Sequence, residues 1–248
     1  MRVLAVIPAR FGSTRFTGKP LIKISGREMI LRVCDQVKQC QSVHDSVVAT
    51  DDQRIFDCVT QAGYVAMMTR SDHETGTDRL VEVVRARNEE LILNVQGDEP
   101  FCDPSHLDLL VNRYLKSGQD CVMATLNKPV LSVEEMQNPN VVKSLVNQKD
   151  RALYFSRACV PWPRDGGIEN PDWLNICQAH IGVYLYQREF LLNFASLPKS
   201  SLEVFEKLEQ LRVLDAGYQI YCVKVDKSAP GIDTPEDLIR AENWLKRA

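Results

Sequence analysis

The chain opens with an unbroken apolar run, Val3 to Ile7. A continuous rather than alternating apolar run is typical of a strand buried on both faces, as in a parallel sheet covered by helices. A polar loop with glycines at positions 12 and 18 follows, and then a stretch from Met29 to Cys40 whose apolar residues recur at helical spacing. A buried strand followed by a loop and a helix is the repeating unit of α/β proteins, so this feature selects the fold class.

The same alternation continues through the first hundred residues. Further strands are predicted over 46–49, 64–67 and 91–95, and helices over 53–62 and 77–87. This order predicts a doubly wound, mostly parallel sheet with right-handed crossovers. Ligands bind outside the carboxyl ends of the strands in such sheets. The polar segments after Ile7, Ala49, Met67 and Val95 are therefore expected to surround one site.

The alternation is lost between residues 125 and 186, where short β-like runs (141–146, 152–155 and 180–186) flank a turn-rich stretch. We interpret residues 125–186 as a small β-rich insertion in a single domain that spans residues 1–248. The insertion is expected to carry sugar contacts and is a candidate dimerisation surface. A helix over 202–216, a strand over 220–225 and a final helix with Thr234 at its N-cap restore the α/β pattern.

Composition excludes several classes of function. The net charge of −3 gives no basic field that would attract nucleic acid or a membrane surface. The eight cysteines form no CxxC pair, which favours free thiols in a reducing cytosol over disulfides or a zinc site. The N-terminal apolar run is too short for a signal sequence or a membrane span, and no later uncharged segment reaches spanning length. A soluble, cytoplasmic protein is expected.

The loop after the first strand concentrates positive charge. It carries Ser13 and Thr14 together with Arg10, Arg15 and Lys19 and the two glycines. Arginine binds phosphate oxygens in a fork and glycine lets backbone N–H groups approach them, so the loop suits a polyphosphate. A Walker A loop is excluded, because five residues separate the glycines and Pro20 stands where the magnesium-binding hydroxyl belongs. The alternative to a phosphate-binding loop is a solvated basic turn without a binding role.

Two aspartates follow strand ends. Asp98 lies just beyond the strand over 91–95, and Asp233 comes shortly before the last helix. Magnesium takes one or two protein carboxylates and completes its octahedron with water and phosphate oxygens, which favours a Mg²⁺ site. Each aspartate taken alone is more often a turn former or a helix cap.

The segments that carry this chemistry resemble one family. They read IPARFGSTRFTGKP, VATDD, TRSDHETGTDR, NVQGDEP, ALYFSRACVPW, HIGVYLY, LEQLR and GIDTPEDL, and they extend over nearly the whole chain. The chain resembles the 3-deoxy-manno-octulosonate (Kdo) cytidylyltransferases, which share a Rossmann-like fold with nucleotide-diphospho-sugar transferases. The resemblance implies a Mg²⁺-dependent homodimer that transfers CMP from CTP to Kdo, with release of diphosphate, for lipopolysaccharide assembly.

The resemblance also implies roles for individual residues. The triphosphate would be held by Arg10, Ser13, Arg15 and Lys19, and the cytidine pocket would be lined by Arg70, Asp72, Thr75, Gly76 and Thr77. Asp98 and Asp233 would bind the metal and, with Lys19, form the catalytic group. The sugar would be contacted by Gln96, Arg157, His180, Tyr184, Glu209 and Gln210.

The chain departs from the family pattern at three places. Phe16-Thr17 replaces the usual Leu-Pro before Gly18, and Thr75 replaces the usual serine; both changes keep the charges and the hydroxyl. The loop at 229–232, before Asp233, is shorter than usual, which affects how this carboxylate is presented.

Purely structural roles remain as alternatives for the residues that the resemblance assigns to the sugar. Glu209 and Gln210 could form the solvated face of a helix, His180 could be a satisfied core histidine, and Arg157 could pair with Asp165.

The implied reaction is in-line attack of the anomeric hydroxyl of Kdo on the α-phosphorus of CTP, and no general base stands out. Two other functions remain: a nucleotidyltransferase for another acceptor, such as sialic acid or a hexose 1-phosphate, and a non-catalytic nucleotide-binding module.

Overall fold

The computed structural model describes residues 1–12, 16–73, 75–167, 170, 172–229, 231–232, 237–239 and 241–242. The chain divides into two compact units. Unit 1 comprises Met1–Asp108, Tyr186–Leu192 and Ala229–Ala248, and unit 2 comprises Leu109–Leu185 and Asn193–Ser228. The chain passes between the units within helix α4 (Pro104–Ser117), and again near the end of strand β10 (Gln178–Gln187) and within helix α7 (Arg188–Phe194).

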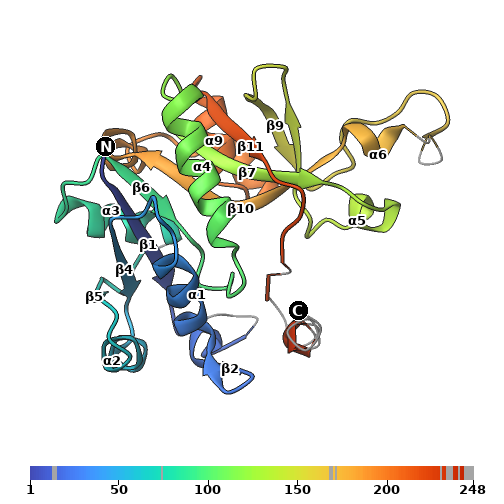
Figure 1. Ribbon diagram of the computed structural model, residues 1–248. Helices are drawn as coiled ribbons and strands as arrows, with labels where there is room; N and C mark the ends of the chain where they lie inside the picture. The colour runs from blue at the N-terminus through green and yellow to red at the C-terminus, as the bar shows by residue number, and fades with distance from the viewer. Residues whose placement is uncertain are drawn as a thin grey trace. The chain divides into compact units, whose positions relative to one another are not determined.

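Unit 1 contains a parallel sheet (Figure 1). Its strands are β1 (Val3–Ala9), β4 (Asp45–Thr50), β5 (Ala66–Met68) and β6 (Leu91–Asn94), in the order β6-β1-β4-β5. In the middle of the sheet Val6 pairs with Val47 on one side and Asn94 on the other. The apolar run at the start of the chain is thus the central strand, and burial of both its faces explains why it does not alternate with polar residues.

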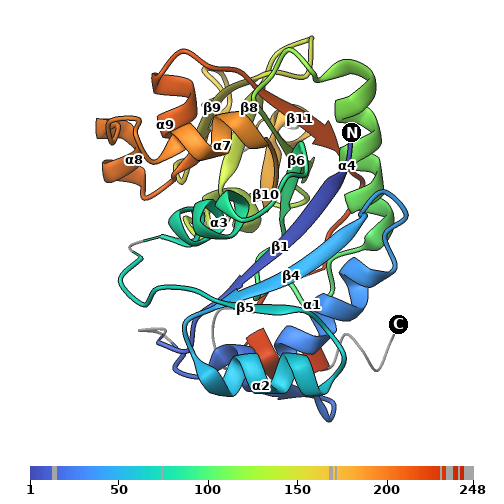
Figure 2. The ribbon, with the colours of Figure 1, turned by 90° about the vertical axis from the view of Figure 1, so that its left-hand side faces the viewer.

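Helices cover both faces of these strands. They are α1 (Met29–Lys38), α2 (Gln53–Gln61) and α3 (Gly76–Arg85). Figure 2 shows α3 on one side of β1 and β4 and α1 with α2 on the other. Between β1 and α1 the chain forms a 3-10 turn, η1 (Lys19–Leu21), and a small hairpin of β2 (Lys23–Ile24) and β3 (Arg27–Glu28).

The strand order of unit 1 reverses once. The chain visits β1, β4 and β5 moving in one direction and then returns to place β6 on the other side of β1. The carboxyl ends of β1 and β6 therefore flank a topological switch point, where open α/β sheets bind their ligands. The predicted doubly wound fold is confirmed, and the switch point selects two of the four polar segments as the centre of the site.

Unit 2 contains a mixed arrangement of strands. They are β7 (Met123–Pro129), β8 (Lys143–Val146), β9 (Ala152–Ser156), β11 (Ile220–Lys224) and most of β10. Strand β11 is parallel to β7, β7 neighbours β10, and β8 runs antiparallel to both β9 and β10. The three β-like runs predicted between residues 125 and 186 correspond to β8, β9 and β10. That these residues form a separate sugar-binding or dimerisation insertion stays a prediction.

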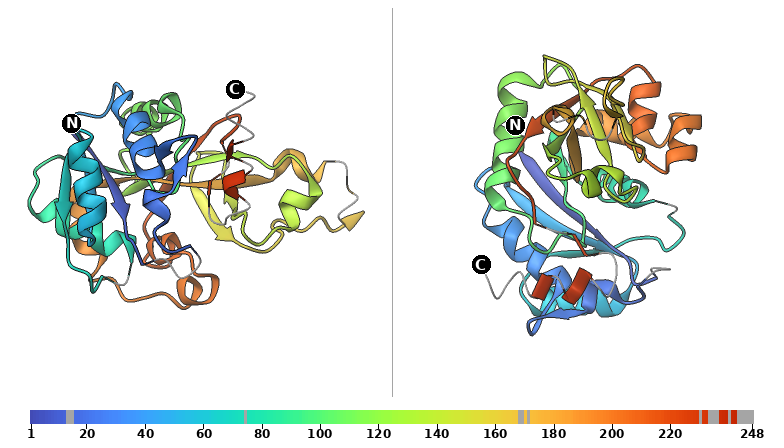
Figure 3. Two further views of the ribbon diagram at one scale, coloured as in Figure 1. Left: turned by 90° about the horizontal axis from the view of Figure 1, so that it is seen from below. Right: turned by 90° about the vertical axis from the view of Figure 1, so that its right-hand side faces the viewer.

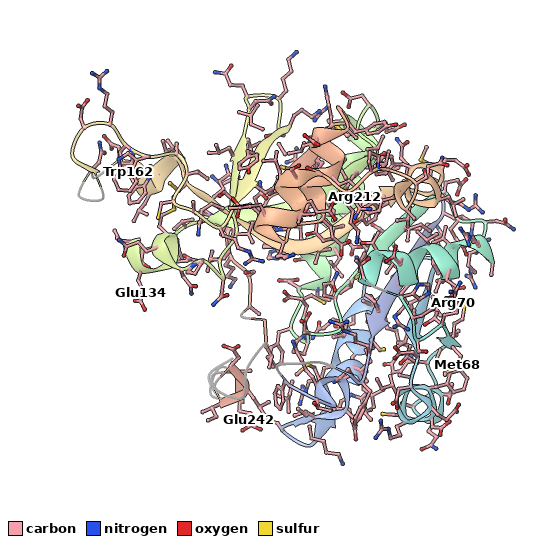
Figure 4. All side chains as sticks on the ribbon, turned by 180° about the vertical axis from the view of Figure 1, so that it is seen from behind. Met68, Arg70, Glu134, Trp162, Arg212 and Glu242 are labelled. Atoms are coloured by element: carbon pink, nitrogen blue, oxygen red, sulfur yellow. The ribbon has the colours of Figure 1, made fainter. Side chains whose placement is uncertain are left out.

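Two short helices lie side by side at one end of unit 2, as Figures 1 and 3 show. They are α5 (Val133–Gln137) and α6 (Trp173–Ile176). Met136 of α5 and Trp173 of α6 pack in one apolar cluster with residues at the end of β7 and the start of β10. Trp162 packs edge-on against Trp173 yet stays mostly exposed (labelled in Figure 4).

The helix predicted over 202–216 is wrong in one respect, because two helices occupy this stretch. Helix α8 (Ser201–Glu206) ends at Lys207, whose φ of 56° is left-handed, and α9 (Gln210–Asp215) begins three residues later. A buried ion pair between Glu203 and Arg212 joins the two helices. The break lets Leu208 and Gln210 turn into the interior, which apolar spacing alone did not indicate.

Two further predictions concern the chain as a whole. In the described ranges, no helix is both long and apolar enough to cross a membrane. All eight cysteines are free thiols. The predicted N-cap of the last helix, Thr234, lies outside the described residues.

Candidate active site

The first cluster lies in unit 1 at the switch point between β1 and β6. Lys19, at the end of the loop that follows β1, extends its ammonium group to 2.8 Å from Oδ2 of Asp98, in the turn that follows β6. Lys19 is buried (8 % exposed), whereas the Asp98 side chain is 40 % exposed. Two residues 79 positions apart in sequence thus form an ion pair at the place where the fold binds ligands.

The loop between β1 and η1 is closed by Gly18. Its amide donates a hydrogen bond to the carbonyl of Phe11 at 3.0 Å, and its φ of +73° is in the left-handed region. The Phe11 ring is in contact with Gly18 on one side and lies under the guanidinium of Arg54, at 3.4 Å from the ring centroid. Arg10 is exposed at the end of β1. Ser13 and Arg15 lie outside the described residues, so their phosphate-binding role stays a prediction.

The turn after β6 is held close to β1. A Cβ atom on Gly97 would lie 2.8 Å from the carbonyl oxygen of Pro8, so only glycine allows this approach. Gln96, before it, donates from Nε2 to Oδ1 of Asn94 at 3.3 Å. The glycine predicted as part of a turn therefore sets the distance between the two strand ends, and Asp98 follows it directly.

The segment before Asp233 also reaches this turn. The amide of Ile232 donates to the carbonyl oxygen of Asp98 at 3.2 Å, and Gly231 lies against the carboxylate of Glu99. Asp233 itself lies outside the described residues. Among those that are described, no three His, Cys, Asp or Glu side chains form a metal cluster. Mg²⁺ needs only one or two protein carboxylates, so a partly exposed Asp98 fits this ion as one ligand.

The segment predicted to line the cytidine pocket forms the start of helix α3. Thr75 is its N-cap: its hydroxyl accepts from the amide of Asp78, and the Asp78 carboxylate accepts from the Thr75 amide. Gly76 is the first helical residue and Thr77 is buried behind it. The capping box satisfies two of the amides that a helix start leaves without partners.

Arg79 of α3 connects this helix to the residues that follow β4 and β5. Its guanidinium is buried and donates to Asp51 at 2.8 Å and to the hydroxyl of Thr69. The ends of β4 and β5 are thereby tied to α3. By contrast, Arg70 and Asp72 form an exposed ion pair (Arg70 is labelled in Figure 4), in which the arginine lowers the pKa of the Asp72 carboxyl.

The second cluster lies in unit 2 and is built around His180 of β10. Its Nε2 is 2.9 Å from the hydroxyl of Thr125 in β7, and its ring packs against those of Phe155 and Tyr184. Burial lowers the pKa of His180 to about 3, so the ring is neutral at physiological pH. Burial also raises the pKa of Tyr184 far above its usual value, so its phenol keeps its proton.

The Tyr184 hydroxyl donates to Oε1 of Gln210 at 3.4 Å. Gln210 is only 4 % exposed, so the alternative that it belongs to a solvated helix face is wrong. Its Nε2 is buried and has no hydrogen-bond partner among the described residues. Glu209, one residue earlier, is half-buried at the N-cap position of α9. The structure thus brings together His180, Tyr184 and Gln210, which are up to thirty residues apart in sequence.

Arg157 is fixed by backbone carbonyl groups. Its Nε donates to Glu206 at 2.8 Å and its Nη1 to Pro139 at 2.9 Å. The Glu206 carboxylate instead accepts from the Arg157 amide and from the hydroxyl of Ser156. Within the part of the chain that the structure describes, no ion pair joins Arg157 to Asp165, so that alternative is wrong. Both of these guanidinium contacts are with neutral carbonyl groups.

Sequence reasoning missed Thr125 and the Glu203–Arg212 pair. Thr125 is a β-branched residue inside a strand, where it is expected on packing grounds alone. Glu203 and Arg212 are nine residues apart on what read as one helix, and a spacing of nine does not bring side chains together on a helix. Only the break at Lys207 brings these two side chains together.

The fold and the unit 1 cluster define a nucleotidyltransferase, and comparison with known proteins agrees. Residues 4–220 match the cytidylyltransferase family. A 3-deoxy-manno-octulosonate cytidylyltransferase of Syntrophotalea carbinolica is 47 % identical over 250 residues, covering 99 % of both chains. The enzyme of that name from Trichlorobacter lovleyi is 43 % identical over the full length of both chains.

A solved structure supports the same relationship. A CMP:2-keto-3-deoxy-manno-octonic acid synthetase in complex with CTP is 39 % identical, has a TM-score of 0.93 and covers 100 % of this chain and 99 % of its own. The chain therefore belongs to the 3-deoxy-manno-octulosonate cytidylyltransferase family, and the resemblance read from its motifs is confirmed.

Proposed function

We propose that this protein transfers CMP from CTP to Kdo, forming CMP-Kdo and diphosphate for lipopolysaccharide biosynthesis. The observation that carries the proposal is the Lys19–Asp98 pair at the switch point between β1 and β6, in a chain related over its full length to enzymes of that name. A cation and a carboxylate at that position suit a nucleoside triphosphate and its metal ion.

Unit 1 carries the groups proposed for the nucleotide. Lys19 and the exposed Arg10, with Ser13 and Arg15 of the same loop, bind the triphosphate. The cytidine pocket is assigned to Arg70, Asp72, Thr75, Gly76 and Thr77. The backbone geometry of this segment is set by the capping box of α3 and by buried Arg79. Its amides and hydroxyls are therefore held in place before the nucleotide arrives, which reduces the entropy lost on binding.

Asp98 and Asp233 are proposed as the carboxylate ligands of Mg²⁺. The bond from Ile232 to Asp98 brings the backbone next to Asp233 to the Asp98 turn. When bound, Mg²⁺ would neutralise phosphate charge and lower the pKa of a coordinated hydroxyl. In the absence of nucleotide the Asp98 carboxylate is instead compensated by Lys19.

Positioning and electrostatics carry the reaction, because an in-line phosphoryl transfer asks little covalent chemistry of the protein. Lys19 and the loop arginines would stabilise the charge that develops on the departing diphosphate. We assign no general base. His180, the histidine among the proposed sugar residues, is already neutral but is proposed to hold the sugar rather than to accept a proton in the reaction.

Unit 2 carries most of the groups proposed for the sugar acid. Arg157 offers a positive charge to a carboxylate, while His180, Tyr184, Glu209 and Gln210 offer neutral or acceptor groups to hydroxyls. Gln96 of unit 1 is assigned to the sugar as well. The buried Nε2 of Gln210, which has no hydrogen-bond partner among the described residues, supports ligand binding here, because native proteins rarely leave such a group unpaired.

A homodimer in the cytoplasm is part of the proposal. Unit 2 exposes several large apolar side chains, among them Phe205 at 93 %, Leu202 and Val204 of α8, and Leu153 of β9. Large exposed apolar side chains are typical of surfaces that associate. Size-exclusion chromatography with light scattering tests this part, and a monomer at micromolar concentration contradicts it.

Diphosphate release with CTP and a panel of acceptors tests the function. We expect turnover with Kdo and little with sialic acid or hexose 1-phosphates. Equal or faster turnover with one of the latter identifies a transferase for another acceptor. Binding of CTP without turnover of any acceptor identifies a non-catalytic nucleotide-binding module.

A further inference from the structure

Thr125 lies in the interior of β7, fully buried, and its hydroxyl has three polar neighbours among the described residues, all in β10. Oγ1 is 2.8 Å from the carbonyl oxygen of Val183, 3.2 Å from that of Ile181 and 2.9 Å from Nε2 of His180. Thr125 belongs to unit 2, outside the segments proposed to bind the nucleotide, and it is not one of the residues proposed to contact the sugar.

The chemistry of these neighbours fixes the position of the hydrogen atoms. A carbonyl oxygen only accepts hydrogen bonds, and a hydroxyl has one hydrogen to donate. Thr125 Oγ1 lies 2.8 Å from the carbonyl oxygen of Val183. Without a hydrogen between them, two oxygens at this distance would repel each other, so the hydroxyl hydrogen points to that carbonyl. Toward His180 the hydroxyl can then only accept, and Nε2 must carry the hydrogen.

A neutral imidazole carries one hydrogen on its two ring nitrogens. Burial keeps His180 neutral, because its pKa is lowered to about 3. With the hydrogen on Nε2, the other nitrogen, Nδ1, has a bare lone pair and acts only as an acceptor. In the described ranges no protein group donates to Nδ1, and His180 is not fully covered, so a ligand can reach the residue.

The same cluster contains a donor that has no hydrogen-bond partner among the described residues. Tyr184, whose ring lies 5.3 Å from that of His180, donates to Oε1 of Gln210, which leaves Nε2 of Gln210 buried and unpaired among the described residues. Leaving a buried donor unpaired is costly, so its presence points to a missing acceptor. The acceptor Nδ1 of His180 and the donor Nε2 of Gln210 are together complementary to the hydroxyl groups of a sugar.

We propose that Thr125 is a positioning residue of the sugar site: it fixes His180 in the Nε2-protonated form, so that Nδ1 accepts a hydrogen bond from a hydroxyl group of the sugar acid. This inference rests on the proposed function of the unit 2 cluster. It also assigns an orientation. The carboxylate of the sugar acid cannot face Nδ1, because two acceptors repel; a hydroxyl must be there, and the carboxylate belongs near a cation such as Arg157.

The first test measures the hydrogen position in the ligand-free protein. Histidine ring nitrogens are labelled with ¹⁵N, and two-dimensional spectra that correlate ring carbon-bound protons with both nitrogens distinguish the two neutral forms. The resonances are assigned by omission in His180→Asn. We expect a protonated Nε2 and a bare Nδ1 in the wild type, mixed forms in Thr125→Val, and the wild-type pattern in Thr125→Ser, which keeps the hydroxyl. A wild-type ring protonated on Nδ1 overturns the proposal.

The second test follows the substrates. In Thr125→Val we expect the KM for Kdo to rise about tenfold, the effect of about one neutral hydrogen bond, with the KM for CTP unchanged and with recovery in Thr125→Ser. Circular dichroism confirms that each variant is folded. If Thr125→Val alters the position of the ring hydrogen on His180 but leaves the KM for Kdo unchanged, the proposal is overturned. If the wild type uses another acceptor instead of Kdo, the proposed function fails, whereas the hydrogen position on His180 is still measured by the first test.

Discussion

Lys19 and Asp98 form an ion pair with 2.8 Å between Nζ and Oδ2, at the carboxyl ends of the two strands that flank the switch point of the sheet. Each residue is proposed to bind a different part of the metal–nucleotide complex. We therefore expect the pair to separate when the substrate binds, so that Lys19 would contact phosphate and Asp98 would be available to hold the metal ion. Until then, each neutralises the charge of the other.

The first prediction concerns Lys19→Met. Turnover should fall at least about 100-fold, because a cation that stabilises the departing diphosphate is lost. At the same time, Mn²⁺ should bind more tightly to the nucleotide-free variant than to the wild type, because Lys19 no longer competes for Asp98. Electron paramagnetic resonance of Mn²⁺ measures this. Lys23→Met, which removes an exposed lysine of the neighbouring hairpin, serves as the control; weaker or unchanged Mn²⁺ binding in Lys19→Met contradicts the competition.

The second prediction concerns Asp98→Asn. The change keeps the size of the side chain and removes its charge, so turnover should fall at least about 1,000-fold through loss of a metal ligand. The Asp98 side chain is partly exposed but its partner Lys19 is buried, so the free energy of unfolding should also fall, by about 1 to 3 kcal/mol. Steady-state kinetics and urea unfolding measure the two effects. Asp57→Asn, on the exposed face of α2, should affect neither; normal turnover in Asp98→Asn rules out the metal assignment.

The third prediction concerns the cap of α3. Thr75→Ala should lower the free energy of unfolding by about 1 kcal/mol and raise the KM for CTP, whereas Thr75→Ser should lie within a few tenths of a kcal/mol of the wild type. The matched control is Ser132→Ala, which removes the N-cap of α5 and should reduce stability without changing the KM for CTP. An equal effect of both alanine variants on the KM for CTP would indicate general loosening rather than a role of α3 in binding.

The fourth prediction compares a buried ion pair with an exposed one. Glu203→Gln leaves Arg212 buried without its carboxylate partner, so we expect a loss of about 3 kcal/mol or more in the free energy of unfolding. Asp72→Asn breaks the exposed pair with Arg70 and should leave the free energy of unfolding almost unchanged, because solvent screens this pair. Urea unfolding measures both. Similar losses in the two variants would show that the Glu203–Arg212 ion pair does not determine stability. Both arginines, Arg70 and Arg212, are labelled in Figure 4.

The fifth prediction is a pH dependence of stability. In the unfolded chain His180 takes up a proton below about pH 6.5, whereas in the folded protein its pKa is about 3. The unfolded state therefore binds more protons in this window, and stability falls as the pH decreases. Between about pH 7 and about pH 5.5 the wild type should lose about 1 kcal/mol more than His180→Asn. The other three histidines are present in both proteins, so their contributions cancel. Equal losses in the two proteins would contradict a neutral His180 ring in the folded state.

The sequence determined the α/β fold, because an unbroken apolar strand such as Val3–Ile7 is stable only when both its faces are covered. It also determined most of the candidate site residues, since phosphate and metal binding require particular side chains at strand ends and the family motifs identify the rest. Each of these signals is local, because it lies within a few consecutive residues of one strand, loop or motif.

Only the tertiary structure decided which of those residues meet. The return of β6 to the far side of β1 brings Asp98 to Lys19, and Gly97 sets the approach against Pro8. The left-handed turn at Lys207 buries Gln210 and pairs Glu203 with Arg212. Thr125 contacts His180 only because β7 and β10 are neighbours. Hydrogen bonds and ion pairs depend on distances of a few ångströms between residues far apart in the chain, and those distances are set by strand order and packing rather than by local sequence.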